Sequence, residues 1–379
     1  MEKKLSVAVV GLRFGAEFPA IYRDHPNITS VTICERNENL LHEYGNKFGF
    51  DRRVTDFNDL LTDDSIDAIH IVSDIFSHYN LTMAALKAGK HCACTVPMAT
   101  TIDQLRDIIA AQKQSGKTFM LMETAVYTFQ CLYVKEMIDR GEMGRVQYLR
   151  GTHFQDMENW PEYWMGLPPF WYATHAVSPL MFLSGARAKK VYALGSGVMN
   201  ADYQARHGNP FPIETAVMEL EAPDGKPLAA EFGRSLFNTA RSYVEGFTVF
   251  GEKKSFEWDM EYEPAYLFEM ESDSAGRGNT IREQRIQAPD YADRLPEGIR
   301  KYTKRHTVLD PNNPHQSIAQ GGEHHGSHPH MVHEFIMSIV ENRKPMIDAV
   351  TAANWNAPGI CAHESAMAGG KEIIVPVFE

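Results

Sequence analysis

The sequence predicts an α/β protein in which a doubly wound parallel sheet is followed by an α+β domain with an open, mostly antiparallel sheet. Three observations predict this fold class. A chain of 379 residues exceeds what one hydrophobic core normally serves. Strand and helix patterns alternate along the first part of the chain, whereas strand patterns follow one another after it. We therefore expect a first domain at residues 1–125 and a second domain at residues 126–379.

The first domain contains strand-like runs separated by helix-like runs. Strands are expected in LSVAVVG, SVTICER, DAIHIVSD, HCACTV and TFMLMET. Helices are expected in AEFPAIYRDHP, NLLHEYGNKFG, HYNLTMAALKAGK and TIDQLRDIIAAQKQSG, the last three with a glycine near the end. Strict alternation of this kind favours a parallel, doubly wound sheet.

The second domain is expected to be rich in strands. Strand-like runs lie in QYLRGTHFQDM, KKVYALGSGVM, TAVMELEA, LAAEFGRSLF, GFTVFGEKKSFEWD and PAYLFEMES. They indicate a mostly antiparallel sheet with one open face. Residues 274–326 are polar and rich in Gly, Pro and Asn, so we expect a long excursion or a partly ordered loop there. Two helical patterns follow, HPHMVHEFIMSIVEN and TAANWNAPGICAHESAMAG.

The composition excludes several classes of partner. The chain has 37 basic and 49 acidic residues, a net charge of −12, and no basic block, which argues against binding nucleic acid or anionic lipid. Its five cysteines follow neither zinc-site nor disulfide spacing, which indicates a reducing compartment. The first apolar run is too short for a signal peptide, and no run approaches the ~20 apolar residues of a membrane span. We expect a soluble, cytoplasmic protein.

A glycine-containing turn, GLRFGA at residues 11–16, follows the first strand. A dinucleotide-binding fold needs glycines here so that the backbone can approach the pyrophosphate at a helix N-terminus. The match to G-x-G-x-x-G is incomplete, because Arg13 stands at the second glycine position and Ala16 at the third. The turn alone is therefore a weak signal.

The end of the second strand strengthens that signal. Glu35 lies 24 residues after Gly11, where a carboxylate accepts hydrogen bonds from the ribose 2′-hydroxyl. A carboxylate repels a 2′-phosphate, which favours NAD over NADP, although Arg36 or Arg13 could pair with such a phosphate. The alternative is that Glu35 is a solvated loop acid.

Three segments, VVGLRFGAEF, IVSDIFSHYNLTMAALKAGKH and CTVPMATT, together resemble the Gfo/Idh/MocA oxidoreductases. The C-terminal segments HEFIMSIVENRKP and GICAHESAMAGG resemble the closing helices of that family. The resemblance implies a Rossmann domain, an open-faced α+β domain, NAD as the cofactor, and a sugar or inositol substrate. It also implies cofactor contacts at the following residues: Gly11, Arg13, Phe14, Gly15, Ala16, Glu35, Arg36, Ser73, His78, Thr95, Val96, Pro97 and Glu123.

The chain departs from the family at two of three usual catalytic places. Members keep Glu-Lys-Pro in the turn after the fourth strand, where this chain has Thr95, Val96 and Pro97. Members also tend to keep an aspartate four residues before a histidine; here the histidine is His175 and Trp171 stands at the aspartate position. His175 is then the remaining candidate for the general base. The alternative is a structural histidine with satisfied hydrogen bonds.

Other residues are candidates for binding a sugar. Polar groups at expected strand ends and aromatic rings ahead of His175 suit sugar hydroxyls and the apolar faces of sugars. The set is Tyr127, His153, Gln155, Asp156, Trp160, Trp171 and His328. Part of the aromatic cluster is equally expected in a core. His330 and His333 share a helix face at a spacing that can ligate metal, but no cysteine or carboxylate completes such a site, so we expect no metal.

The function expected from these features is NAD-dependent oxidation of a ring hydroxyl of a sugar or glycoside to a ketone, with His175 as the base. For a glycoside, the expected ring position is the 3-position. Two alternatives stay open. One is a redox-neutral glycosidase or epimerase with tightly held NAD, and the other is a non-catalytic NAD-binding regulatory protein. The open sheet face predicts a homo-oligomer.

Overall fold

The computed structural model describes residues 3–260, 263–271, 278–310 and 313–379, and its contacts divide the chain into two compact units. The first unit comprises Met1–Thr128 and Asp290–Ala353, and the second comprises Phe129–Pro289 and Asn354–Glu379. We expected residues 290–353 in the second domain. They lie in the first unit because α10 (Ser327–Val340) packs against α1 (Phe18–Arg23) and η2 (Thr124–Tyr127).

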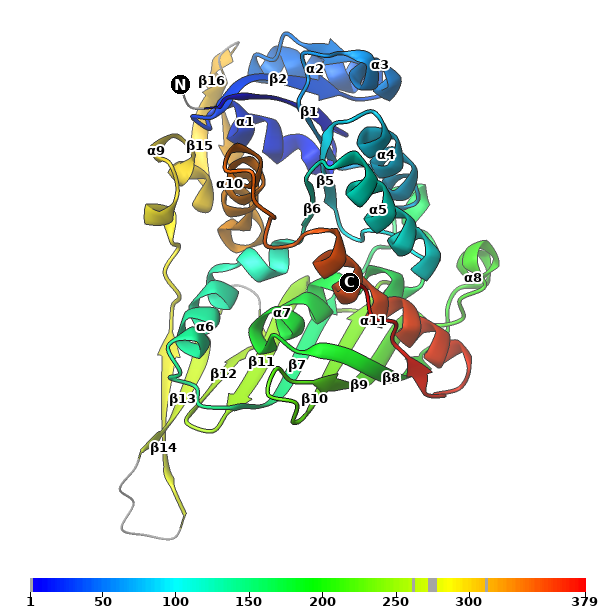
Figure 1. Ribbon diagram of the computed structural model, residues 1–379, viewed down its shortest axis with the longest axis vertical. Helices are drawn as coiled ribbons and strands as arrows, with labels where there is room; N and C mark the ends of the chain where they lie inside the picture. The colour runs from blue at the N-terminus through cyan, green and yellow to red at the C-terminus, as the bar shows by residue number, and fades with distance from the viewer. Residues whose placement is uncertain (1–2, 261–262, 272–277, 311–312) are drawn as a thin grey trace. The chain divides into compact units, whose positions relative to one another are not determined.

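The predicted doubly wound parallel sheet is confirmed in the first unit (Figure 1). Its strand order is β3-β2-β1-β4-β5-β6, the order of a Rossmann fold. The strands are β1 (Leu5–Val10), β2 (Ile28–Cys34), β3 (Arg53–Val54), β4 (Ala68–Ile71), β5 (His91–Thr95) and β6 (Phe119–Met122). The remaining helices before η2 are η1 (Phe14–Glu17), α2 (Glu38–Phe48), α3 (Phe57–Thr62), α4 (Ile75–Lys87) and α5 (Ile102–Ser115).

The helices of this sheet begin and end where their sequence signals place them. Asn37, Asp74 and Thr101 each accept a hydrogen bond from a backbone N–H of the first turn of α2, α4 and α5, respectively. Gly49 and Gly116 adopt left-handed backbone conformations at the ends of α2 and α5. These caps fix the lengths of the crossover connections between parallel strands.

The segment that we expected to be a long excursion or partly ordered loop contains regular structure where it is described. β14 (Thr280–Ile286) pairs antiparallel with β13 (Ala265–Glu271) in the second unit. In the first unit, β15 (His306–Asp310) and β16 (Asn313–Gln320) form a two-stranded sheet, accompanied by η5 (Ala292–Arg294), α9 (Glu297–Arg300), η6 (Lys301–Thr303) and η7 (Glu323–Gly326). The loop prediction was wrong for these stretches, because strand pairing supplies the hydrogen bonds that a polar composition did not suggest. Residues 274–277 and 311–312 lie outside the described residues.

The second unit is built on a nine-stranded, mostly antiparallel sheet with the order β14-β13-β12-β11-β7-β10-β9-β8-β17. Its other strands are β7 (Val146–Phe154), β8 (Arg187–Ser196), β9 (Ile213–Glu221), β10 (Pro227–Ser235), β11 (Val244–Gly251), β12 (Lys254–Trp258) and β17 (Ile373–Ile374). Its helices are α6 (Phe129–Asp139), η3 (Glu162–Trp164), η4 (Pro169–Tyr172), α7 (Thr174–Ser184), α8 (Ala201–His207) and most of α11 (Ala349–Met367). The predicted α+β fold is confirmed.

Helix α7 lies directly on β7, β10 and β11 (Figure 1). The close approach depends on Gly151 in β7, since a Cβ atom there would lie 1.9 Å from the carbonyl oxygen of Ala176. Only glycine leaves room for the helix backbone at this point. The first turn of α7, which carries His175, is therefore held against the middle of the sheet.

Among the described residues, no helix is both long enough and apolar enough to cross a membrane.

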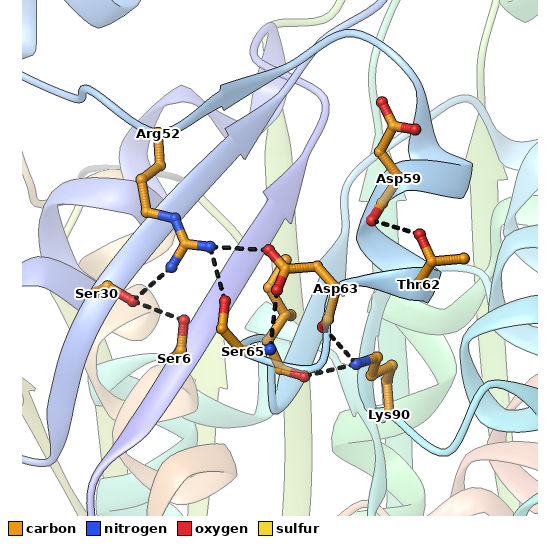
Figure 2. Close-up of polar contacts among 9 residues, drawn as sticks. Ser6, Ser30, Arg52, Asp59, Thr62, Asp63, Ser65 and Lys90 are labelled. Carbon is orange, nitrogen blue, oxygen red and sulfur yellow. Dashed lines mark hydrogen bonds and ion pairs between the residues drawn. The ribbon is translucent and has the colours of Figure 1, made fainter.

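A polar network joins the strands of the first unit near their amino ends (Figure 2). Arg52 donates to Ser30 at 3.2 Å, to Asp63 at 2.9 Å and to Ser65 at 2.9 Å. Next to it, the buried Nζ of Lys90 donates to the carbonyl oxygens of Asp63 at 2.7 Å and Ile66 at 2.9 Å. Lys90 therefore ties the start of β5 to the turn before β4.

Replacing Lys90 with methionine should lower the free energy of unfolding by ~1–3 kcal/mol, because two buried carbonyl oxygens lose a charged donor. Urea denaturation of the full chain measures the change. Lys87, which is exposed at the end of α4, provides the matched control, and Lys87→Met should leave stability within about 0.5 kcal/mol of the original. Equal stabilities for both variants would contradict the role of Lys90.

Candidate active site

The carboxyl ends of five parallel strands meet at one edge of the sheet in the first unit. Val10 pairs with Cys34 and Ile71, Ile71 pairs with Cys94, and Thr95 pairs with Met122. The residues at and after these ends include five that we predicted to contact the cofactor: Gly11, Glu35, Ser73, Thr95 and Glu123. Ligands of doubly wound sheets bind at this edge.

The turn after β1 has the geometry of a dinucleotide cradle. Gly11 has a φ of +95°, and a Cβ atom there would lie 2.2 Å from the carbonyl oxygen of Val72. The backbone of the turn thus passes closely over the end of β4, which only glycine permits. Gly15, the next glycine, is buried against the side chain of Val72. The cradle fits the pyrophosphate of a dinucleotide.

Glu35 is positioned beside that turn. Its carboxylate accepts hydrogen bonds from the backbone N–H of Leu12 at 3.1 Å and of Asn37 at 3.0 Å. The carboxylate therefore lies within hydrogen-bonding distance of the glycine turn, at the place where a ribose hydroxyl would be received.

The other predicted residues of the turn are more open. The ring of Phe14 is 46% exposed, and Arg13 is also exposed. The side chain of Arg36 is 88% exposed and lies 4.0 Å from Asp74. Ala16 accepts a hydrogen bond from the Tyr44 hydroxyl through its carbonyl oxygen. Both arginines can therefore move toward a bound ligand, whereas Ala16 is fixed by α2.

His78 is buried, and both of its ring nitrogens face carbonyl oxygens. Nδ1 lies 2.8 Å from the oxygen of Pro97 and Nε2 lies 3.2 Å from the oxygen of Ser73. Because carbonyl oxygens only accept hydrogen bonds, both nitrogens must carry protons to satisfy this arrangement. His78 thus joins the turn after β4 to the turn after β5.

The charged form of His78 is favoured by its surroundings. Burial alone would lower the pKa of the imidazole, but Cys94 and the carbonyl groups of Pro97 and Ser73 outweigh burial and raise the pKa to about 9. The turn that His78 supports contains the cis Val96–Pro97 bond, and Val96 is buried. Just before it, the Thr95 hydroxyl donates to the Ile71 carbonyl oxygen at 3.2 Å.

The second unit places a row of three ionisable side chains beneath α7. In the sheet register, His153 of β7 pairs with Arg234 of β10 on one side and with Glu245 of β11 on the other. All three residues are buried, and residues paired across strands share one face of a sheet. The Arg234 guanidinium donates to three carbonyl oxygens, those of Tyr172, His153 and Ser235, at 2.7–3.1 Å.

His175 lies over this row. Its Nε2 is 3.3 Å from the hydroxyl oxygen of Tyr172, and its Nδ1 is 3.6 Å from Oε1 of Glu245. Its ring also meets that of His153 edge to face, with centroids 4.8 Å apart. The same Glu245 oxygen accepts a hydrogen bond from the Tyr243 hydroxyl. An imidazole is thus held between a hydroxyl and a carboxylate.

Two other predicted substrate residues of the second unit adjoin this cluster. Gln155 accepts from Arg234 at 3.2 Å, and its backbone N–H donates to the Ser235 hydroxyl at 3.1 Å. Asp156 follows it and accepts from the backbone N–H of Glu158 at 2.9 Å.

The predicted aromatic residues of that unit have different neighbours. Trp160 lies edge to face against Trp164, which in turn contacts Tyr172. The ring of Trp171 contacts His207 and His363, at centroid distances of 6.0 and 5.7 Å. The structure therefore brings Trp160 toward the His175 cluster through two aromatic contacts and gives Trp171 contacts with α8 and α11.

The remaining two predicted substrate residues lie in the first unit. Tyr127 is buried at the end of η2, and burial raises the pKa of its phenol. The ring of His328 contacts that of Phe18 in a tilted arrangement, with centroids 4.6 Å apart. The neighbouring histidines face different groups, since His330 contacts the Asp290 carbonyl oxygen and His333 contacts His25. In the described part of the chain, no group of three or more potential metal ligands lies close enough to hold an ion.

Sequence reasoning missed Arg234, Tyr243 and Glu245 as site residues. The signal was present but weak: Arg234 is the charged residue of the run FGRSLF, and Glu245 is the charged residue of the run VEGFTVF. A charged residue inside such a run either faces solvent or is buried with a partner. Only the strand register shows that both residues face α7.

Comparisons with known proteins agree with this geometry. Residues 5–123 match the model of the GFO_IDH_MocA family, described as an oxidoreductase family with an NAD-binding Rossmann fold. Glycosyl hydrolase family 109 protein 1 of Bacteroides thetaiotaomicron is 30% identical over 150 residues, which cover 36% of this chain and 32% of that protein. Levoglucosan dehydrogenase of Pseudarthrobacter phenanthrenivorans is 30% identical over 124 residues, covering 33% and 32%. The chain thus matches about a third of the length of these curated relatives.

A solved structure of levoglucosan dehydrogenase in complex with NADH has the same fold. It superposes with a TM-score of 0.77 at 20% sequence identity, covering 99% of this chain and 100% of that one.

The fold and the carboxyl-edge site together define the first unit as a dinucleotide-binding Rossmann domain. More particularly, residues 5–123 match the NAD-binding Rossmann domain of the Gfo/Idh/MocA oxidoreductases, which confirms the resemblance seen in the sequence and the expected cofactor, NAD.

Replacing Glu35 with serine should weaken NAD binding and narrow the gap between NAD and NADP, because the change removes a ribose acceptor and a charge that repels a 2′-phosphate. Isothermal titration with both cofactors measures the effect. Glu38→Ser, an exposed position one turn away on α2, is the matched control. An unchanged cofactor preference in Glu35→Ser would remove this residue from the ribose site.

The His78 imidazolium should make stability depend on pH. A folded-state pKa of about 9 lies above the ordinary 6.5, so its contribution is present below about pH 6.5 and is lost as pH rises through 9. Between these pH values the original chain should lose on the order of 2–3 kcal/mol relative to His78→Gln, which has no titrating group there. Urea denaturation at pH 6, 7.5 and 9 measures both proteins. Parallel curves for the two proteins would show that His78 is not a buried cation.

Proposed function

We propose that the protein is an NAD-dependent oxidoreductase that oxidises a ring hydroxyl of a sugar or glycoside to a ketone. One observation carries the proposal: a chain with an NAD-binding domain also holds a histidine, His175, between a hydroxyl and a buried carboxylate. The name of the relative levoglucosan dehydrogenase supports a carbohydrate substrate. The proposed ring position is the 3-position of a glycoside, where a ketone acidifies the neighbouring C–H bond and prepares the glycosidic bond for elimination.

Oxidation of a secondary alcohol removes a hydride from carbon and a proton from oxygen while the C=O bond forms. NAD⁺ supplies the hydride acceptor when it is bound. In this proposal His175 receives the proton at Nε2, because an imidazole nitrogen that carries no proton can act as a general base. Tyr172 is partly exposed whereas His175 is 3% exposed, so the Tyr172 hydroxyl is the group through which the proton reaches Nε2.

The residues of the first unit hold the cofactor in this proposal. The backbone around Gly11 would hold the pyrophosphate and Glu35 the ribose, and the turn supported by His78 would contribute to the nicotinamide end of the site. Val96 has no group that can bind or release a proton. In this proposal the proton acceptor is His175 of the second unit.

A second candidate function is a redox-neutral glycosidase that keeps its NAD. The relative called glycosyl hydrolase family 109 protein 1 favours it. Purified protein would then carry NAD(H) at stoichiometric occupancy and turn over without added cofactor. A non-catalytic regulatory role would be indicated instead if no glycoside of a broad panel produced either NADH or a cleaved product.

We further propose that the protein forms a homo-oligomer through the open sheet face. Leu194 and Val217 on adjacent strands β8 and β9 are 58% and 51% exposed. Apolar side chains in such a position are commonly covered by a second subunit.

All five cysteines are free and buried, which suits a reducing, cytoplasmic environment.

The direct test is a glycoside panel with NAD⁺, followed by mass spectrometry for the loss of two hydrogens from the substrate. With an active substrate, His175→Ala should lower kcat/KM by about 10²-fold or more, because no group then accepts the hydroxyl proton. NAD affinity should not change. His42→Ala, at an exposed histidine of α2, is the control and should keep full activity. Near-normal turnover by His175→Ala would remove this residue from the role of base.

A further inference from the structure

Glu245 is the buried carboxylate beside His175, and it has no step of its own in the proposed reaction. It is the second residue of β11 and is 2% exposed. Its register partner, His153, points to the same side of the sheet, and α7 covers that side. Burying a carboxylate is costly unless nearby donors and positive charges compensate it. The position therefore requires an explanation in terms of its neighbours.

Two hydroxyl- or nitrogen-bearing groups converge on the same oxygen of Glu245. The Tyr243 hydroxyl donates to Oε1, and Nδ1 of His175 lies 3.6 Å from that oxygen. This distance exceeds that of a hydrogen bond, so the contact with His175 is electrostatic in the state described. Its energy grows when the imidazole becomes positively charged.

The orientation of the ring follows from this contact. With Nδ1 toward a carboxylate, the tautomer that carries its proton on Nδ1 is favoured, and Nε2 is left with a free lone pair. Nε2 is the nitrogen that faces the Tyr172 hydroxyl, 3.3 Å away. Glu245 thus selects the tautomer in which the nitrogen facing Tyr172 can accept a proton.

A second charged residue near His175, Arg234, explains why an imidazolium there needs the Glu245 carboxylate. Arg234 on β10 is fully buried beside the cluster, and burial lowers the pKa of its guanidinium to about 10 while Tyr172, Tyr243 and Glu245 act in the opposite direction. A buried cation next to the residues that contact His175 disfavours a second positive charge on the imidazole. Glu245 offsets that repulsion.

Two further ionisable side chains lie on elements that pack against α7, His153 close to His175 and Lys135 far from it. His153 on β7 contacts the His175 ring edge to face. On α6, Lys135 lies over Phe182, which is two turns further along α7.

We propose that Glu245 is the positioning residue of His175: it fixes the Nδ1–H tautomer and stabilises the imidazolium that forms when the substrate proton is taken up. The carboxylate comes from strand β11, 70 residues beyond the histidine, rather than from position 171 of the preceding turn, where the chain has tryptophan. This inference rests on the proposed role of His175 as the base.

The test compares Glu245→Gln, Glu245→Asp and the control Glu257→Gln, whose side chain lies on β12 between the buried Phe256 and Trp258 and therefore points to the opposite face. The full chain is assayed for kcat/KM against pH with NAD⁺ and an active glycoside. Glu245→Gln should lower kcat/KM by about 10²-fold or more and move its acid limb down by about one pH unit, since the imidazolium loses its counter-charge. Glu245→Asp should recover part of the loss, and Glu257→Gln should match the original protein.

A second readout does not depend on activity. In the chain labelled with ¹³C-histidine, the His175 resonance is assigned by its absence in His175→Asn and titrated in each variant. Its pKa should fall by about one unit in Glu245→Gln and should rise in Tyr243→Phe, which frees the carboxylate from a donor without removing it. Tyr243→Phe also serves if Glu245→Gln fails to fold.

The outcomes separate the two proposals. A changed His175 titration in a protein that oxidises no glycoside would support the Glu245–His175 pair and overturn the proposed function. An unchanged titration in Glu245→Gln, or in Tyr243→Phe where the first variant does not fold, would overturn the role of Glu245 even if the original protein is an active dehydrogenase. A lower Tm with unchanged pH profiles would likewise show that Glu245 only supports the fold.

Discussion

A positive charge can be buried only where hydrogen-bond acceptors replace the water that it loses, and that constraint shapes both units of this protein. Lys90 and Arg234 donate to backbone carbonyl oxygens from different elements, and His78 faces two such oxygens with both ring nitrogens. Each of these cations joins turns or strands that are distant in sequence and that hydrogen bonds between neighbouring residues do not connect. The candidate cofactor edge and the surroundings of His175, the proposed base, each contain one of these buried cations.

His78 and Arg234, the two buried cations nearest the proposed chemistry, hold different kinds of structural element. His78 joins two loops, so it determines the shape of a surface that is otherwise made of short turns. Arg234 joins the end of η4 to the strand ends of β7 and β10, so it determines where the residues just before α7 are held. Loops and the first turns of helices fluctuate when no tertiary contact holds them. Their rigidity in this chain comes from side chains rather than from regular secondary structure.

The sequence was sufficient for the first unit up to residue 128 and for the cofactor edge, because in a doubly wound sheet each strand end is followed at once by the residues that it presents. Gly11, Glu35 and Ser73 could therefore be named as candidates from local pattern alone, and their contacts with NAD stay predictions. The assignment of residues 290–353 was not accessible in this way, since α10 is placed by tertiary packing on α1. In the second unit, local pattern made His175 a candidate base but did not single out Glu245. Their approach depends on strand register and on a glycine beneath α7, neither of which a single sequence reveals.

The order of the segments has a consequence for synthesis on the ribosome. The chain leaves the first unit after Thr128 and returns to it at Asp290, so α10 is made long after the sheet whose α1 it covers. A nascent chain that ends near residue 289 has all the strands of the parallel sheet but leaves the α10-facing side of α1 bare. Completion of the NAD-binding unit must wait for the residues up to 353. The second unit, which needs α11, is completed later still, and a truncation between these points leaves apolar surface for chaperones to shield.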